Sequence, residues 1–271
     1  MSLTFRICTI VKNILKRLSI YAGGGGGGGI DFNFFNAVTP ETLHDAYHLM
    51  PALEYTQKLS PGEKACLMSH APLWQKCLNG DMPYMGIFED DIVLGKNAYL
   101  LLKDDNWLKK RFGDDAVIIR LEATLQRANL KKTAAAPVKH LTFLELQNPL
   151  HGSGAYIISK AAAKLLMADL RYIPVSRADE VKAADWVVFE NMLHRDDIKV
   201  YQVMPAVCTQ GLFLPEYHHL GSELDEDRVR HHRKNPYPKR KKTLSEWVAY
   251  ILATPKRKYL KYKRTSIPFE K

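Results

Sequence analysis

Hydrophobic positions along the chain follow two periods, one typical of strands and one typical of helices. Short apolar runs at residues 84–88, 116–121 and 155–158 predict buried strands, and residues 199–203 predict another. Residues 30–38 alternate apolar and polar side chains, as a half-buried strand does. Because helical stretches separate these strands, the pattern favours an α/β fold in which helices pack on a sheet.

Capping residues mark where helices begin. Ser60 can accept a hydrogen bond at a helix start, Pro61 suits the first turn, and Glu63 completes a capping box. Apolar side chains then recur at helical spacing as far as about Leu78. Ser159 can cap a second helix directly after the strand at 155–158.

Charge divides the chain into two parts. Residues 228–271 hold 15 Lys and Arg against two acids, a net charge of +13, whereas residues 1–227 carry about −3 of the overall +10. We therefore expect a folded domain at 1–227 and a basic tail at 228–271. Such a tail attracts polyanions, either nucleic acid or an anionic membrane surface, or is a solvated terminus without a partner.

The tail contains one amphipathic helix. Thr243 and Glu246 form a second capping box, and five apolar residues then lie at i, i+3, i+4, i+7 and i+8. These are Leu244, Trp247, Val248, Ile251 and Leu252. Basic clusters at 239–242 and 256–258 flank the helix, and each Lys or Arg near an anionic surface contributes about 1 kcal/mol. The stripe is expected either at a membrane surface or against the protein's own body.

The composition limits the size of the core and the cellular environment that we expect for the protein. With 271 residues and 46% hydrophobic content, the chain can build one large core. It has no run of about 18 apolar residues, and basic residues interrupt 1–22, so neither a spanning helix nor a secretory signal is expected. Scattered cysteines favour neither a disulfide framework nor a zinc site, and a reducing cytoplasm is the simpler setting. The glycine run at 23–29 is neither a packed element nor a phosphate-binding loop.

The strongest candidate for chemistry is Glu89-Asp90-Asp91, three acids directly after the predicted strand at 84–88. Their mutual repulsion requires solvent or a cation, and carboxylate oxygens suit Mg²⁺ or Mn²⁺. Ligands of open α/β sheets bind beyond the carboxyl ends of strands, where these acids would lie. A metal there would neutralise a departing nucleoside diphosphate, although acid triplets also occur in ordinary surface turns.

Group transfer of this kind also needs a carboxylate base that deprotonates an acceptor hydroxyl. Asp185 and Glu190, which share a helical pattern, rank first and Glu122 ranks third, although each could equally be a helix cap or a surface acid. His70 lies on an apolar helix face, where a lone histidine is usually a core residue. The small residues that follow His151 allow a sugar or phosphate to approach closely, or form a simple turn.

Taken in order, these segments resemble glycosyltransferase family 25, the lipooligosaccharide-type galactosyltransferases. The matching segments span about residues 31–211 and read DFNFFNAVTP, LSPGEKACLMSHAPLWQKCL, YMGIFEDDIVL, HGSGAYIISKAAAKLL and ADWVVFENML. The resemblance implies a glycosyltransferase-A type fold, with a Rossmann-like mixed sheet flanked by helices, here followed by the basic helical tail. It also implies an inverting enzyme that uses Mn²⁺ or Mg²⁺ to transfer a hexose, galactose first, from a UDP-sugar to a lipooligosaccharide or lipopolysaccharide acceptor.

The resemblance further implies roles for individual residues. Asp91 and Glu89 would hold the metal, and Asp185, with Glu190 as the alternative, would be the base. The donor side of the cleft and the sugar pocket would be lined by Gly62, Glu63, Ser69, His70, Glu89, Asp90, Gly152, Ser153 and Gly154. Family members usually carry an arginine-containing segment after their first strand, where this chain has its glycine run, and this departure puts donor affinity in question. The basic tail fits a peripheral enzyme at the inner face of the bacterial inner membrane, acting on a lipid-linked acceptor.

Other functions stay open at this stage. The donor could be UDP-glucose or another UDP-sugar, the same acids could serve a nucleotidyl- or phosphotransferase, or the chain could be an inactive relative. In a different class, the tail could make the protein a module that binds nucleic acid or an anionic surface without catalysis. Nucleic acid is not expected, because the tail lacks regularly spaced aromatic residues and the domain is slightly acidic. The sequence does not indicate an oligomeric state.

Overall fold

The computed structural model describes residues 5–11, 32–103, 105–216, 223–236 and 243–271. The glycine run and the basic cluster at 239–242 lie outside the described residues, as do the first two residues of the strand predicted at 30–38. Within the described part of the chain, no helix combines the length and apolar character needed to cross a membrane.

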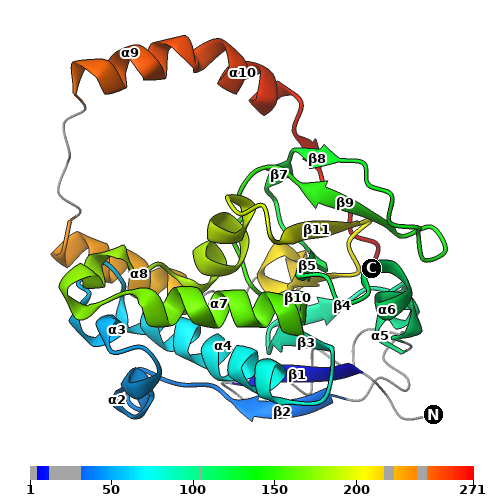
Figure 1. Ribbon diagram of the computed structural model, residues 1–271, viewed down its shortest axis with the longest axis horizontal. Helices are drawn as coiled ribbons and strands as arrows, with labels where there is room; N and C mark the ends of the chain where they lie inside the picture. Colours follow the sequence, from blue (N-terminus) through cyan, green and yellow to red (C-terminus); the bar gives the residue numbers. More distant parts are fainter. Residues whose placement is uncertain (1–4, 12–31, 104, 217–222, 237–242) are drawn as a thin grey trace.

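A mixed sheet of eight strands forms the centre of the fold (Figure 1). In sheet order the strands are β2 (Phe32–Asn36), β1 (Phe5–Val11), β3 (Tyr84–Glu89), β10 (Ala155–Ser159), β5 (Val117–Arg120), β11 (Lys199–Met204), β9 (Thr142–Leu146) and β8 (Leu130–Lys131). The first three strands are parallel, and β10 runs antiparallel between β3 and β5. Therefore β3 and β5 end at the same edge of the sheet, and β10 begins there.

Helices cover both faces of this sheet. On one face α4 (Pro61–Asn79) and α7 (Lys160–Tyr172) lie side by side, and on the other lie α5 (Tyr99–Leu102) and α6 (Asn106–Phe112). The remaining helices are α2 (Leu43–Ala46), η1 (Tyr47–Leu49), α3 (Ala52–Tyr55), η2 (Val175–Glu180), η3 (Trp186–Asn191), η4 (Gly211–Phe213), α8 (Glu223–Lys234), α9 (Leu244–Leu252) and α10 (Thr254–Tyr262). A small second sheet joins β4 (Ile92–Leu94), β12 (Cys208–Gln210) and β6 (Glu122–Ala123).

The side chains of β3 explain why an unbroken apolar run forms a strand here. Met85 and Ile87 belong to the core packed by α4 and α7, whereas Tyr84 and Phe88 belong to the core packed by α5 and α6. Successive side chains of a strand point to opposite faces, so a strand covered on both faces must be apolar throughout. The acids begin where this cover ends.

The predicted α/β fold, a mixed sheet flanked by helices, is confirmed. The capping box at the start of α4 is present, with Glu63 N donating to Ser60 Oγ (3.2 Å) and Ser60 N donating to Glu63 Oε2 (2.9 Å). The helix predicted from Asp185 onward is also present, but its central part, η3, has the wider π-helical hydrogen bonding. Several short strands, β6 among them, have no clear sequence signal because their partners are distant in the chain.

The C-terminal part of the chain returns to the body. The expected boundary between residues 227 and 228 falls inside α8, and Asp227 Oδ2 accepts a hydrogen bond from Gly62 N at 2.8 Å. Beyond α10, β13 (Thr265–Ser266) pairs with β7 (Arg127–Ala128), and the following Ile267 is buried. The basic segment is therefore attached to the domain at both ends.

Candidate active site

A pocket of about 250 Å³ opens at the edge of the sheet where β3 and β5 end. Its walls come from the start of α4, the end of β3, the loop before β10, the start of η3, η4 and α8. Its lining includes Glu63, Cys66, Glu89, Gln126, His151, Gly152, Ser153, Asp185, Gln210, Leu224, Asp225 and Arg228. The pocket lies where ligands of open α/β sheets bind, beyond the carboxyl ends of the strands.

A chain of hydrogen bonds from the core positions Glu89. Trp74 Nε1 donates to Tyr156 Oη at 2.8 Å, and Tyr156 Oη lies 2.9 Å from His70 Nδ1. Because the indole can only donate, the tyrosine oxygen accepts from it and its own proton goes to Nδ1. His70 then carries its proton on Nε2 and donates to Glu89 Oε1, 3.2 Å away. These partners assign the tautomer of His70, and the chain of hydrogen bonds orients the Glu89 carboxylate toward the pocket.

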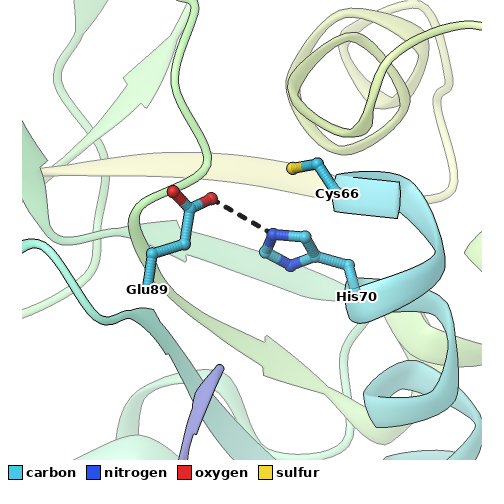
Figure 2. Close-up of side chains that lie close together, drawn as sticks. All are labelled: Cys66, His70 and Glu89. Carbon is cyan, nitrogen blue, oxygen red and sulfur yellow. Dashed lines mark hydrogen bonds and ion pairs between the residues drawn. The ribbon is translucent and has the colours of Figure 1, made fainter. Parts of the chain in front are cut away.

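The three side chains in Figure 2 also form a candidate metal cluster. Cys66, His70 and Glu89 each place one possible ligand atom within 4.8 Å of the others, the group of this kind found among the described residues. In the assigned tautomer, however, His70 Nε2 donates a proton and has no lone pair for a metal. Burial also raises the pKa of the Cys66 thiol well above its ordinary value, which disfavours the thiolate. Hydrogen bonding to Glu89 therefore accounts for this cluster without a metal.

Two carboxylates beside Glu89, the partly buried Asp91 and the buried Glu122, are incompletely satisfied. Asp91 Oδ2 accepts a hydrogen bond from Gln210 Nε2 at 3.2 Å, and Glu122 Oε1 lies 3.1 Å from Arg120 Nη2. Their other oxygens, Asp91 Oδ1 and Glu122 Oε2, are buried without a hydrogen-bond partner in the part of the chain described. Burial, followed by the charge of Glu89, raises the pKa of Asp91 well above its ordinary value. Burial likewise raises the pKa of Glu122 to about 7, although Arg120 opposes that shift.

This group of acids fits a hard divalent cation. Glu89, Asp90, Asp91 and Glu122 repel one another electrostatically, and each repulsion raises the pKa of Asp91. A cation bound at the free Asp91 oxygen would remove both the repulsion and the unsatisfied polar atom. Mg²⁺ and Mn²⁺ prefer such oxygen ligands. The residues present therefore match the chemistry of the predicted metal.

The glycines before β10 let these acids approach the backbone closely. Gly154 N donates to Glu122 Oε1 at 3.1 Å, and a Cβ on Gly154 would lie only 2.7 Å from Ile92 Cδ1. Gly152 has φ +95°, a conformation that side-chain-bearing residues rarely adopt. A larger residue at Gly154 would collide with Ile92 and Glu122. The approach of a sugar or phosphate to this loop stays a prediction.

Asp185 fastens this loop to η3. Its Oδ2 accepts a hydrogen bond from Gly152 N at 3.2 Å and lies 3.4 Å from His151 Nδ1, while its Oδ1 caps Trp186 N at 2.9 Å. Burial raises the pKa of Asp185, but His151 and the backbone donors outweigh that effect and lower it overall. The hydrogen bond to Asp185 raises the pKa of His151. Asp185 is therefore ionised in the pocket at neutral pH.

The structure brings together only some of the predicted site residues. Glu63, Glu89, Gly152, Ser153 and Asp185 line the pocket. The residues predicted for the site that are not in its lining are Gly62, Ser69, His70, Asp90, Asp91, Gly154 and Glu190.

Three of the predicted residues that do not line the pocket have structural roles. Ser69 Oγ accepts a hydrogen bond from Val38 N at 2.9 Å and donates to Ala65 O at 2.8 Å, which ties the segment after β2 to α4. His70 is buried and acts on Glu89. Asp91 reaches the pocket through Gln210, which does line it.

Sequence reasoning missed several pocket residues, Arg228 above all. Arg228 was counted with the basic tail, yet α8 brings it into the lining together with Leu224 and Asp225. Leu224 and Arg228 are four residues apart and share one helix face, which is the signal that could have revealed them. Gln126 lies on a loop and Gln210 ends the short strand β12, and no local sequence pattern marks either as a binding residue.

Comparison with known proteins places the chain among sugar-transferring enzymes. Residues 9–182 match the family described as glycosyltransferase family 25 (LPS biosynthesis protein). The lacto-N-neotetraose biosynthesis glycosyltransferase LgtE of Neisseria meningitidis is 38% identical over 216 residues, 76% of each chain. The lipooligosaccharide biosynthesis protein lic2B of Haemophilus influenzae is 36% identical over 232 residues, 84% of this chain and 83% of its own. The chain therefore belongs to glycosyltransferase family 25.

Similarity to solved structures is weaker. The inositol-1-phosphate CTP transferase of T. maritima aligns with a TM-score of 0.37 and 9% identity, over 86% of this chain and 97% of its own. Such a score supports no conclusion about the fold or the function.

The ion pair between Asp185 and His151 gives a testable titration. In Asp185→Asn, the pKa of His151 is expected to fall toward its ordinary value of about 6.5, because the main cause of its elevation is removed. NMR titration of the His151 ring protons measures this shift. In Glu190→Gln only a weaker charge effect is lost, so a smaller change is expected. Equal titration of His151 in wild type and Asp185→Asn would contradict the assigned pair.

The same pair has a definite pH dependence of stability. The pKa of His151 is raised in the folded state, so the stabilisation is complete below the unfolded value of about 6.5. It is lost as the pH rises through the raised value. The difference in free energy of unfolding between wild type and Asp185→Asn should therefore shrink over that range.

Proposed function

We propose that this protein is an inverting, metal-dependent glycosyltransferase of the glycosyltransferase-A type. Its donor would be a UDP-sugar, with galactose as the first candidate hexose, and its acceptor a lipooligosaccharide or lipopolysaccharide glycan. The observation that carries the proposal is the group of partly buried acids at the end of β3, next to a pocket that an ionised Asp185 also lines. The names of the relatives, which include lacto-N-neotetraose and lipooligosaccharide biosynthesis, support this class of acceptor.

Asp91 and Glu89 are the residues proposed to hold Mn²⁺ or Mg²⁺. Asp91 offers a buried oxygen without a hydrogen-bond partner among the described residues, and Glu89 lines the pocket. When bound, the metal would offset the negative charge that develops on the departing diphosphate. His70 and Ser153 both donate to Glu89 Oε1, so they orient this carboxylate.

Asp185 is the proposed base. In an inverting transfer, the acceptor hydroxyl oxygen bonds to the anomeric carbon while the bond from that carbon to the phosphate oxygen breaks. UDP leaves with the electron pair, and Asp185 takes the hydroxyl proton. Asp185 lines the pocket and Glu190 does not, which favours Asp185 over the alternative. The hydrogen bonds from Gly152 N and Trp186 N hold the carboxylate in place for this step.

The remaining pocket residues suit the donor diphosphate. Arg228 and His151 are the basic side chains in the lining, and Arg228 supplies the cation that the family usually places after its first strand. The volume of about 250 Å³ is below the roughly 300–1,000 Å³ of whole ligand sites, so the pocket would hold only part of a UDP-sugar.

A release assay tests the proposed reaction. Purified protein is incubated with Mn²⁺, a panel of UDP-sugars and a truncated lipooligosaccharide acceptor, and free UDP is measured with and without EDTA. One donor should give metal-dependent UDP release. Asp185→Asn should lower kcat by about 10²–10⁴-fold because the base is lost, whereas the matched variant Glu190→Gln should stay near wild type.

Three results would overturn the proposal. Full turnover in EDTA would exclude a required metal. Release of UMP in place of UDP would show attack at the phosphorus next to the sugar, as in a phosphotransferase. Release of sugar 1-phosphate would show attack at the other phosphorus, as in a nucleotidyltransferase. Circular dichroism of both variants controls for folding.

The role of Arg228 has its own test. Arg228→Ala should raise the donor KM about tenfold with little change in kcat, because a charged hydrogen bond to the diphosphate is lost. Arg230→Ala is the control, since Arg230 lies two residues away on α8 and outside the pocket lining. Equal donor KM values for the two variants would remove Arg228 from the site.

A further inference from the structure

The apolar stripe of α9 is exposed to solvent. Leu244, Trp247, Val248, Ile251 and Leu252 have exposed fractions between 49% and 82%. Of the two expected positions for this stripe, packing against the body is therefore not what the structure shows. Exposing five large apolar residues along one helix face is unfavourable in water, so this face fits an apolar environment.

Basic residues accompany the stripe in α10. Lys256, Arg257, Lys258 and Lys261 lie in this helix, and Lys263 and Arg264 follow it, whereas residues 243–264 contain one acid, Glu246. Arg257 lies over the ring of Tyr250, 3.6 Å from its centre, and Lys263 lies over Tyr259 at 4.6 Å. Tyrosine rings between apolar and cationic groups are typical of segments at a membrane boundary.

The described elements before and after this segment, α8 and β13, both lie near the pocket. We call residues 243–264, which contain α9 and α10, the arch, and Figure 1 shows it standing away from the body between α8 and β13. On one side, α8 lines the pocket and is held by Asp227 at the start of α4 and by His231, which lies 2.9 Å from Gln57 O. On the other side, Ser266 of β13 pairs with Arg127, the residue after pocket-lining Gln126.

We propose that the arch docks on an anionic lipid surface and thereby holds the pocket close to that surface. The aliphatic stripe would lie in the boundary between headgroups and acyl chains, and the basic residues would contact the anionic headgroups. The proposal builds on the proposed transfer to a lipid-linked acceptor. Docking would confine enzyme and acceptor to one surface, with the pocket opening beside it.

Two other occupants fit the arch less well. Nucleic acid would use its positive charge but not Leu244, Val248, Ile251 and Leu252, which cannot stack on bases as aromatic rings do. A second copy of this chain would bring two strongly basic arches together, and their charges would repel. An anionic lipid surface matches both the charge and the apolar face.

Vesicle flotation of the full chain tests the proposal. Binding is measured on vesicles of phosphatidylcholine alone and on vesicles that also contain phosphatidylglycerol, at low and high salt. The protein should float with the anionic vesicles only, and high salt should weaken its binding. Ile251→Glu should weaken binding at least about tenfold, because a charged side chain replaces an exposed apolar one that would enter the lipid boundary. Ala249→Glu is the matched control: it adds the same charge off the stripe and should bind more tightly than Ile251→Glu.

Four results would overturn the docking proposal. They are equal binding to both kinds of vesicle, no binding to the anionic ones, equal effects of the two variants, and a concentration-dependent dimer that Ile251→Glu dissociates. Ile251→Glu should release UDP on a soluble acceptor at the wild-type rate, since it does not touch the pocket. Vesicle binding is measured without turnover, so loss of the enzymatic proposal and loss of the docking proposal give different results.

Discussion

The constraint on which the site depends is the convergence of buried and partly buried carboxylates at one edge of the sheet. β3 and β5 run parallel and end together, so Glu89, Asp91 and Glu122 converge where the apolar cover of the sheet stops. Within the described chain, Arg120 is the one guanidinium that pairs with Glu122, and oxygens of Asp91 and Glu122 stay unsatisfied. Such an arrangement is costly in a folded protein unless a cation completes it, and this cost is the physical basis of the proposed metal dependence.

The neighbouring residues follow from this constraint. Gly154 has no side chain because Glu122 and Ile92 occupy the space that a Cβ would need. The chain of hydrogen bonds from Trp74 through Tyr156 and His70 fixes Glu89 from the core side. On the pocket side, Asp185 holds the glycine loop in its place. Each of these contacts joins segments distant in sequence. Together they form one side of the pocket that α8 also lines.

Local sequence signals predicted the helix and strand that carry this site, and the acids after that strand. They did not predict the tertiary contacts that complete the site. The capping box at Ser60, the apolar run of β3 and the acids behind it depend on neighbours in the chain, so the sequence was sufficient to place them. The partners of Glu122 and the pocket position of Arg228 depend on tertiary contacts, which no local pattern encodes. His70 illustrates the difference, because its helix face predicted a core histidine, whereas its bond to Glu89 needed the fold. The tail was visible as a charged, amphipathic segment, but its return to β7 was not.

The central claim is that the acids at the end of β3 hold a metal ion, and that this ion helps to bind the diphosphate of the donor. Calorimetric titration of UDP into the protein tests this claim. With Mn²⁺ present, UDP should bind at least about tenfold more tightly than in EDTA, a difference of about 1.4 kcal/mol. Asp91→Asn should lose this gain while it keeps the affinity measured in EDTA, because only the metal ligand is changed. Equal UDP affinity with and without metal in the wild-type protein would contradict the account.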